Sequence, residues 1–382
     1  MRPLVYLYLV ALCSADRRLV VPEIVHQTYD YRQPNFFMYL SFMCVQHFMK
    51  PKRHILWVND EGRYNKGFWE GWKSKAAPGS WESTLAKLID SGKIEAKFLA
   101  YPIHPPGNDS TFVSNKAHRS DFVRMNALAT MGGMYLDTDA FPVQSLDELR
   151  VHNFTLSFDN IVNPDTSAPK RLNNGVLLAA PGAAFLRVWM QAYSTFDPTS
   201  FEYHSSTLPY HLATQYPDLV HVEWSRISPI SFGFQTSSAA AALACGLYSP
   251  TQRYIWYPRY DPRAKRFTFA SSSPDLELFR ALSQKLVLHL TMSQVRGLCM
   301  MRKTLNGPAD LTKMPSLLGS VFRLAALGED TFDYGALEKA SDAAKDEAWT
   351  TCRNLLGMHT PPDLGDSARQ QYVSSSTSTS RP

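Results

Sequence analysis

Residues 131–139 have the sequence Met131-Gly132-Gly133-Met134-Tyr135-Leu136-Asp137-Thr138-Asp139, an apolar run that opens on a glycine pair and ends in two aspartates. The short, unbroken apolar segment at 134–136 predicts a strand buried on both faces. Asp137 and Asp139 then lie at its carboxyl end. Because side chains alternate along a strand, residues two apart point to the same side, and two carboxylates there can share one divalent cation.

The segment before this strand predicts a helix. Residues 116–131 place apolar side chains at helical spacing, and Gly132 follows them where a helix is expected to stop. On that helix Asp121 and Arg124 are three residues apart and therefore share one face. An Asp-x-Asp sequence alone is common in turns. The combination of helix, glycine turn, buried strand and paired acids is what favours a functional site.

These residues resemble a known motif. Ser120-Asp121-x-x-Arg124 followed by Gly132-Gly133-x-Tyr135-Leu136-Asp137-x-Asp139 is similar to the sugar-binding DXD region of a glycosyltransferase superfamily. Its members include yeast-type initiating alpha-1,6-mannosyltransferases, alpha-1,4-galactosyl- and N-acetylglucosaminyltransferases, and the glucosylating clostridial toxins. The resemblance covers residues 20–180 and the segment around His289.

The resemblance implies a fold. We expect one α/β domain of the GT-A nucleotide-diphospho-sugar transferase type, with a mainly parallel central sheet flanked by helices. Residues 20–357 would form this domain, with a donor-binding half at about 20–180 and an acceptor half at about 181–357.

The resemblance also implies an activity and its metal. The reaction would be metal-dependent, retaining transfer of a sugar from a UDP- or GDP-sugar to a hydroxyl of a glycan, glycolipid or glycoprotein. Asp137 and Asp139 would hold Mn²⁺ or Mg²⁺. His289 matches the late-strand histidine that closes the metal site in many members. A tryptophan often follows that histidine in the family, whereas this chain has Leu290-Thr291-Met292.

Further residues are expected at the donor site. Asp121 and Arg124 would grip the donor sugar and diphosphate, because a guanidinium neutralises phosphate oxygens. The candidate catalytic residues are Asp121, which would grip the donor sugar, and Asp139, which would be the most direct ligand of the metal. No nucleophile emerges from the sequence. The other candidates for donor binding are Tyr29, Tyr135, Asp137, Asn173 and Asn174, and Asp137 would also touch the ribose or a metal-bound water. Tyr29 either stacks on the base or covers a loop, and the asparagines either bind sugar hydroxyls or form a turn.

The rest of the chain supports a parallel sheet. An expected strand at 24–25, a helix at 35–49 and a strand at 53–60 form a crossover typical of parallel sheets, which hold ligands at the carboxyl ends of their strands. Further strands are expected at 94–99, 155–159, 172–180 and 286–293, and a helix at 185–193.

The termini and composition narrow the setting. In residues 1–15, the basic Arg2 is followed by a mostly apolar run. This pattern predicts a signal peptide or a short signal anchor. Such a segment predicts that the protein enters the secretory pathway and is either held in the Golgi lumen or secreted. Membrane association is expected only through this segment, if it is not cleaved. The net charge of +5 comes from scattered residues and gives little support to nucleic-acid binding. The Ser/Thr-rich tail at 361–382 is expected to be disordered.

The cysteines leave the disulfides open. Outside the presumed signal there are four, Cys44, Cys245, Cys299 and Cys352, a number compatible with two disulfides in three possible pairings.

Two other functions remain open. A phosphohydrolase of the haloacid-dehalogenase type also places Asp-x-Asp after a buried strand, but it normally has threonine or valine where this chain has Phe141. A second possibility is a binding protein that keeps the glycosyltransferase fold without turnover.

Overall fold

The computed structural model describes most of the donor half and part of the remainder. The described residues are 18–29, 36–61, 65–159, 171–224, 226–229, 285–289, 307–313 and 317–333, the backbone of 247–249, 254–256, 259–261 and 266–268, and some positions between 336 and 347. The predicted signal or anchor at 1–15 and the predicted tail at 361–382 lie outside them, as does much of the predicted acceptor half. Within these ranges no helix has both the length and the apolar character needed to cross a membrane.

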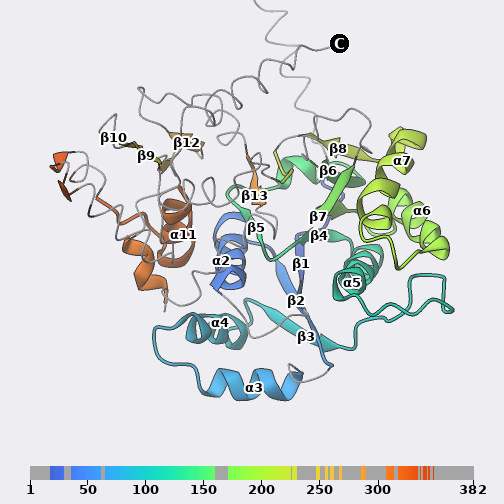
Figure 1. The fold of residues 1–382 in the computed structure, drawn as a ribbon, viewed down its shortest axis with the longest axis horizontal. Helices are drawn as coiled ribbons and strands as arrows, with labels where there is room; N and C mark the ends of the chain where they lie inside the picture. The colour runs from blue at the N-terminus through green and yellow to red at the C-terminus, as the bar shows by residue number, and fades with distance from the viewer. Residues whose placement is uncertain are drawn as a thin grey trace, which may run out of the picture.

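A seven-stranded sheet forms the centre of the molecule (Figure 1), with the strand order β3-β2-β1-β4-β7-β6-β8. Its strands are β1 (Ile24–Tyr29), β2 (Arg53–Asn59), β3 (Glu95–Leu99), β4 (Gly133–Leu136), β6 (Phe154–Phe158), β7 (Leu172–Ala179) and β8 (His221–Glu223). Only β7 is antiparallel to its sheet neighbours. The carboxyl ends of the other six strands therefore lie along one edge. The predicted α/β fold with a mainly parallel sheet is confirmed.

Helices flank this sheet on both sides (Figure 1). They are α2 (Phe36–Cys44), α3 (Lys66–Ser74), α4 (Trp81–Asp90), α5 (Lys116–Met131), α6 (Ala184–Ala192), α7 (Leu208–Gln215) and α11 (Leu317–Leu327). The π-helical segments η1 (Val45–Met49) and η5 (Tyr203–Thr207) adjoin α2 and α7. The 3-10 segments are η3 (Asp147–Leu149), η4 (Tyr193–Thr195), η6 (Pro217–Leu219) and η8 (Pro308–Lys313). Two-stranded ladders join β5 (Ala140–Pro142) to β13 (Val287–His289), β9 (Leu247–Ser249) to β10 (Tyr254–Trp256), and β11 (Arg259–Asp261) to β12 (Arg266–Thr268).

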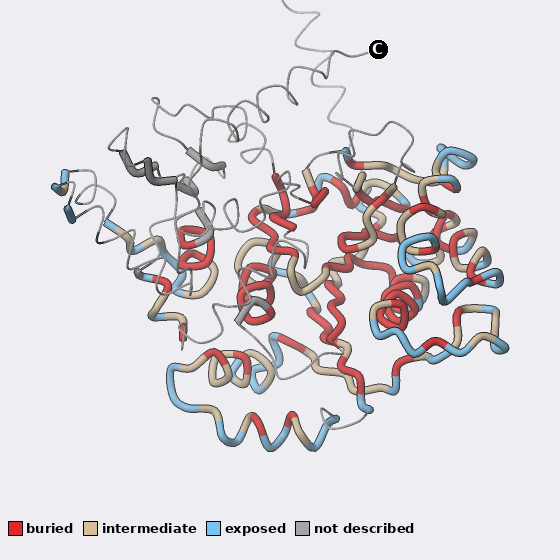
Figure 2. The backbone as a smooth tube through the Cα atoms, in the orientation of Figure 1, coloured by how far each residue is buried: buried red, intermediate tan, exposed pale blue. Residues whose placement is uncertain are grey.

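Alternating residues of the central strands fill two cores. Tyr135 and Leu177 pack into the core under α5 and α6. Met134 and Leu136 pack into the opposite core. Figure 2 shows the consequence: the central strands and α5 are buried, whereas α3 carries exposed residues along its outer side. This two-sided burial confirms the prediction from the apolar run at 134–136.

The end of α5 is as predicted, and the glycine pair explains the turn that follows. α5 ends at Met131, and Gly132, which caps it, has a φ of +63°. Gly133 has a φ of +106°, and a Cβ there would lie 2.5 Å from the carbonyl oxygen of Ile24. Any side chain would push β4 away from β1, so glycine is required for the two strands to pair at this point.

The first of the four cysteines is not in a disulfide. Cys44 is a free thiol buried at the end of α2. The two-disulfide arrangement that the cysteine count allowed is therefore wrong, and Cys245, Cys299 and Cys352 lie outside the described residues.

Candidate active site

The two acids of the motif lie in a turn. β4 ends at Leu136, and Asp137 and Asp139 occupy the connection to β5. The backbone N–H of Asp137 donates to the Gly175 carbonyl at 2.7 Å, and that of Ala140 donates to the Asp137 carbonyl at 3.0 Å. We expected strand alternation to align the two acids. That expectation was wrong, because the strand ends at Leu136, before both of them. The turn brings them together instead.

His289 reaches these acids through the small sheet. β13 pairs antiparallel with β5, which sets His289 opposite Ala140, the residue after Asp139. The His289 Nε2 atom lies 3.6 Å from Asp139 Oδ1. One ligand atom from each of Asp137, Asp139 and His289 lies within 4.8 Å of the other two. The structure thus brings together all three residues predicted to bind metal.

The charges in this group depend on one another. Burial raises the pKa of Asp139, and the neighbouring His289 opposes that rise. Burial lowers the pKa of His289, but Asp139 and the other nearby carboxylates outweigh it, so the net shift is upward. A cation at this point would relieve the crowding of carboxylates.

The residues present fit a divalent cation. Carboxylate oxygens suit Mn²⁺ and Mg²⁺, and imidazole nitrogen is a common ligand of transition-metal ions. The buried Nδ1 of His289 has no hydrogen-bond partner within the described structure. A Cβ on Gly175 would lie 2.4 Å from His289 Cε1 and 2.7 Å from Asp137 Oδ2. Because residue 175 is glycine, the side chains of His289 and Asp137 can occupy the space that a Cβ would fill.

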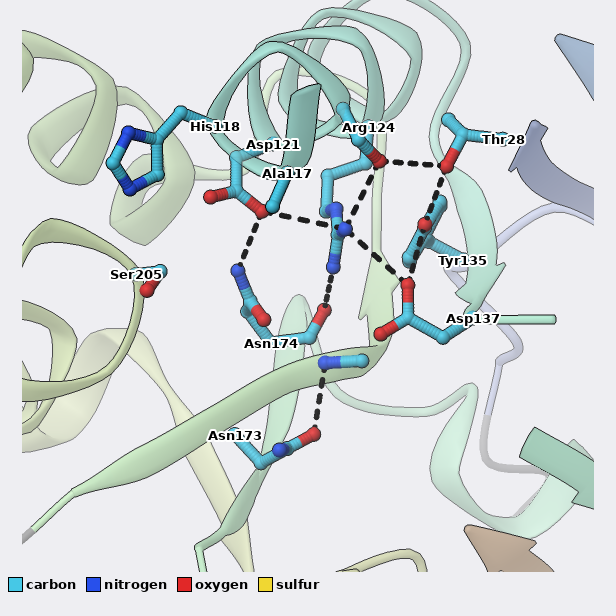
Figure 3. Close-up of polar contacts among 12 residues, drawn as sticks. Thr28, Ala117, His118, Asp121, Arg124, Tyr135, Asp137, Asn173, Asn174 and Ser205 are labelled. Carbon is cyan, nitrogen blue, oxygen red and sulfur yellow. Dashed lines mark hydrogen bonds and ion pairs between the residues drawn. The ribbon is translucent and has the colours of Figure 1, made fainter. Parts of the chain in front are cut away.

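Arg124 ties the metal side of the site to a second cluster (Figure 3). One guanidinium nitrogen lies 3.3 Å from Asp121 Oδ1 and 3.2 Å from Asp137 Oδ1. The other terminal nitrogen donates to the Asn174 carbonyl at 2.8 Å. Burial opposes the charge of Arg124, but Asp137 and its other neighbours raise its pKa. Arg124 is thus a buried cation that positions two carboxylates, and its contact with a diphosphate stays a prediction.

Asp121 has one oxygen in use and one facing away. Asn174 Nδ2 donates to Asp121 Oδ1 at 2.8 Å. Figure 3 draws no contact to the second carboxylate oxygen, which points away from Arg124 and toward the side of His118. Burial raises the pKa of Asp121, and Arg124 opposes this.

Tyr135 connects the motif to the neighbouring strand. Its hydroxyl donates to Asp137 Oδ1 at 2.7 Å and shares a 2.8 Å hydrogen bond with Thr28 Oγ1. Thr28 in turn shares a 2.7 Å bond with Ser120 Oγ. The Arg124 guanidinium lies 4.3 Å above the Tyr135 ring centroid. The tyrosine therefore orients Asp137 and Arg124, and its contact with donor stays a prediction.

A β-bulge shapes the wall formed by β7. Leu156 pairs with Leu177, but Ser157 pairs with Asn173, so residues 174–176 leave the ladder with β6. A bulge re-aims side chains, and here it turns Asn174 toward Asp121. Asn173 instead accepts from the Gly175 N–H at 2.8 Å. Of the two predicted asparagines, the first makes the local turn contact and the second joins the site cluster.

Tyr29 lies at the end of β1, within the core. Its ring is buried and meets Trp69 edge-on at a centroid distance of 6.1 Å. Its backbone N–H donates to the Tyr101 hydroxyl at 3.0 Å. This placement matches the covering role, and stacking of Tyr29 on a base stays a prediction.

Sequence reasoning missed several of these residues. Thr28 joins the network through a hydroxyl that no pattern distinguishes from an ordinary polar position, and Ser120, although part of the motif, was given no role. Gly175 was not among the predicted site residues, although its missing side chain makes room for His289 and Asp137. No local signal points to this, because the crowding comes from residues distant in sequence.

Comparison with known proteins supports the motif. Residues 83–155 match the family described as the glycosyltransferase sugar-binding region containing a DXD motif. The chain is also 32% identical over 108 residues to "Glucan organizing enzyme 1" of Cryptococcus neoformans var. grubii serotype A. That alignment spans 28% of this chain and 30% of the relative's length. The resemblance expected from the sequence is confirmed, and the chain carries a glycosyltransferase-like DXD region.

Solved glycosyltransferases are similar in part. The galactosyltransferase LgtC, solved with donor and acceptor sugar analogues, is 15% identical with a TM-score of 0.32, covering 82% of this chain and 98% of its own. The bifunctional glycosyltransferase WbbM is 10% identical with a TM-score of 0.38, covering 81% of this chain and 50% of its own.

Proposed function

We propose that this protein is a metal-dependent, retaining glycosyltransferase that moves a sugar from a UDP- or GDP-sugar to an acceptor hydroxyl. The observation that carries the proposal is the meeting of Asp137, Asp139 and His289 next to the buried pair of Asp121 and Arg124. One group is suited to a cation and the other to sugar hydroxyls. Asp137 belongs to the first group and contacts Arg124 of the second, so the two groups are adjacent. This suits a sugar nucleotide, in which the diphosphate and the sugar are joined by the bond that breaks.

The residues of this chain would divide the work. When bound, Mn²⁺ or Mg²⁺ supplies Lewis-acid stabilisation of the charge that grows on the leaving diphosphate. Asp137, Asp139 and His289 would hold it. The second oxygen of Asp121, which points toward the side of His118, would accept a bond from a sugar hydroxyl, while Arg124 and Asn174 fix the orientation of that carboxylate. Preorganisation of this kind lowers the barrier without reorganisation during the reaction.

The acceptor and location are part of the proposal. The acceptor would be a glycan, glycolipid or glycoprotein, and because the curated relative's name refers to glucan, glucan oligosaccharides come first in an acceptor screen. The apolar segment at residues 1–15 supports the secretory pathway, either the Golgi lumen or secretion. Cell fractionation of the full chain tests this, and a cytosolic protein would contradict it.

A screen of sugar nucleotides tests the reaction. UDP- and GDP-sugars are incubated with the protein, with and without Mn²⁺, and binding, donor hydrolysis and transfer are measured. Cation-dependent donor cleavage supports the proposal. Binding without cleavage or transfer favours the inactive sugar-nucleotide-binding protein, and release of phosphate from simple phosphomonoesters favours the phosphohydrolase. A protein that binds none of the donors contradicts the transferase.

A further inference from the structure

The carboxyl ends of β6 and β8 open on the same sheet edge as the Asp137 turn. Both strands run parallel to β4, and they pair with each other from Thr155 and His221 to Ser157 and Glu223. Three residues lie at this edge: Phe158, which ends β6, Asp159, which follows it, and Trp224, which follows β8. Ligands of parallel sheets bind at such edges, and none of these three has a role in the site described above.

Trp224 offers an apolar surface at this edge. Its side chain is 65% exposed, the highest value among the exposed large apolar residues of the described structure. Its ring lies 5.0 Å from that of Phe158 at an interplanar angle of 33°. Phe158 packs against the core below α5 and α6. The exposed indole is therefore held from beneath and presents a flat, open face.

Asp159 follows Phe158 in sequence and adds a polar group at the same sheet edge. Its backbone N–H donates to the Arg171 carbonyl at 3.0 Å. Its carboxylate makes no hydrogen bond or ion pair in the part of the chain that the structure describes. Burial raises the pKa of Asp159, and the charge of His289 opposes the rise. The carboxylate thus lies within electrostatic range of the candidate metal group and has accepting capacity to spare.

We propose that Trp224, Phe158 and Asp159 form the acceptor subsite and that its occupant is a saccharide. This rests on the proposed transferase function. The Trp224 face would cover the apolar C–H side of a pyranose ring, and Asp159 would accept hydrogen bonds from its hydroxyls. Continuity with the Asp137 and His289 group favours this occupant, because an acceptor must place one hydroxyl next to the donor sugar. Protein and lipid acceptors offer no such ring.

Acceptor kinetics test this subsite. With the donor that the wild type cleaves, transfer to glucose, mannose and galactose oligosaccharides is measured for Trp224→Ala, Trp224→Phe and Asp159→Asn. Phe112→Ala is the matched control, because Phe112 is 62% exposed and lies in the loop before α5. Trp224→Ala should raise the acceptor KM about tenfold or more, as loss of an aromatic binding residue does. Trp224→Phe should recover most of this, and Asp159→Asn should lower kcat/KM for the acceptor about tenfold.

Each outcome decides between the two proposals. A wild type that cleaves no sugar nucleotide contradicts the transferase function and the subsite with it. A wild type that cleaves its donor, but whose acceptor KM is unchanged in Trp224→Ala, contradicts only the subsite. Donor cleavage with transfer to no oligosaccharide of the panel, or only to protein or lipid that carries no glycan, also overturns it. Thermal denaturation of each variant shows whether the fold is kept, and because Trp224 is exposed, its substitution should not alter the fold.

Discussion

Substituting Gly175 with alanine tests how the candidate metal group is packed. The added Cβ would lie 2.4 Å from His289 Cε1, 2.7 Å from Asp137 Oδ2 and 2.9 Å from His289 Nε2. Ordinary contact with a Cβ begins at 3.4 Å, so His289 must move by about 1 Å. Misplacement by about 1 Å costs on the order of 100-fold in rate, and overpacking costs about 1–3 kcal/mol of stability.

The assay is cation-stimulated cleavage of the donor, with thermal denaturation measured on the same samples. Gly71→Ala is the control, because a Cβ at that position in α3 meets no atom within 4 Å. Alanine in a helix interior should stabilise that variant by about 0.5–1 kcal/mol and leave cleavage unchanged. Wild-type activity and stability in Gly175→Ala would refute the proposed packing of the two ligands around this glycine.

Three further predictions concern buried polar side chains. Tyr135→Phe removes the hydroxyl that holds Asp137, so we expect about a tenfold loss of donor cleavage and about 1 kcal/mol of stability; unchanged kinetics would contradict the orienting role. Arg124→Gln leaves buried carboxylates without a cation and should cost about 3–5 kcal/mol in urea unfolding; a variant as stable as wild type would contradict it. Burial lowers the pKa of His26 to about 4 and that of His54 to about 3. As the pH falls, these histidines therefore bind protons in the unfolded chain before they do so in the folded protein. The free energy of unfolding should fall below about pH 6.5, and His26 and His54 together should lower it by on the order of 3 kcal/mol at about pH 5.5. Denaturation that is flat over this range would refute the burial of two neutral histidines.

The hydrogen bonds of these histidines explain that pH dependence. His26 Nε2 donates to the Gly132 carbonyl at 2.9 Å, and its Nδ1 accepts from Trp57 Nε1 at 3.3 Å. His54 Nε2 donates to Gln27 Oε1 at 2.8 Å, while its Nδ1 lies 3.0 Å from the amide nitrogen of Gln46. Each ring already has one donating and one accepting nitrogen, so a second proton would break a bond in the core.

Local sequence signals predicted much of the fold. The helix at 116–131, its stop at Gly132 and the buried strand after it follow from spacing, a glycine and an apolar run, all within about one turn of their cause. The strands around β1 and β2 were recognisable for the same reason. The reversed direction of β7 and its bulge carry no local signal, because both depend on pairing with strands elsewhere in the chain.

The site was predictable only where resemblance supplied long-range information. Asp137 and Asp139 lie in the turn directly after β4, so their place could be predicted from the sequence around them. His289 reaches them through pairing of β13 with β5, which the apolar stretch around it does not reveal. Trp224 and Asp159 each follow an ordinary short strand, and only the parallel pairing of β6 with β8 places them together at the site edge.

A crystal structure of the protein with Mn²⁺ and the nucleoside diphosphate of the donor that it cleaves, using the anomalous signal of manganese, tests the central claim most directly. We predict one strong anomalous peak within coordination distance of Asp137, Asp139 and His289, with the diphosphate on its open side. A peak at another place, or none at saturating Mn²⁺ and nucleotide, would contradict the account.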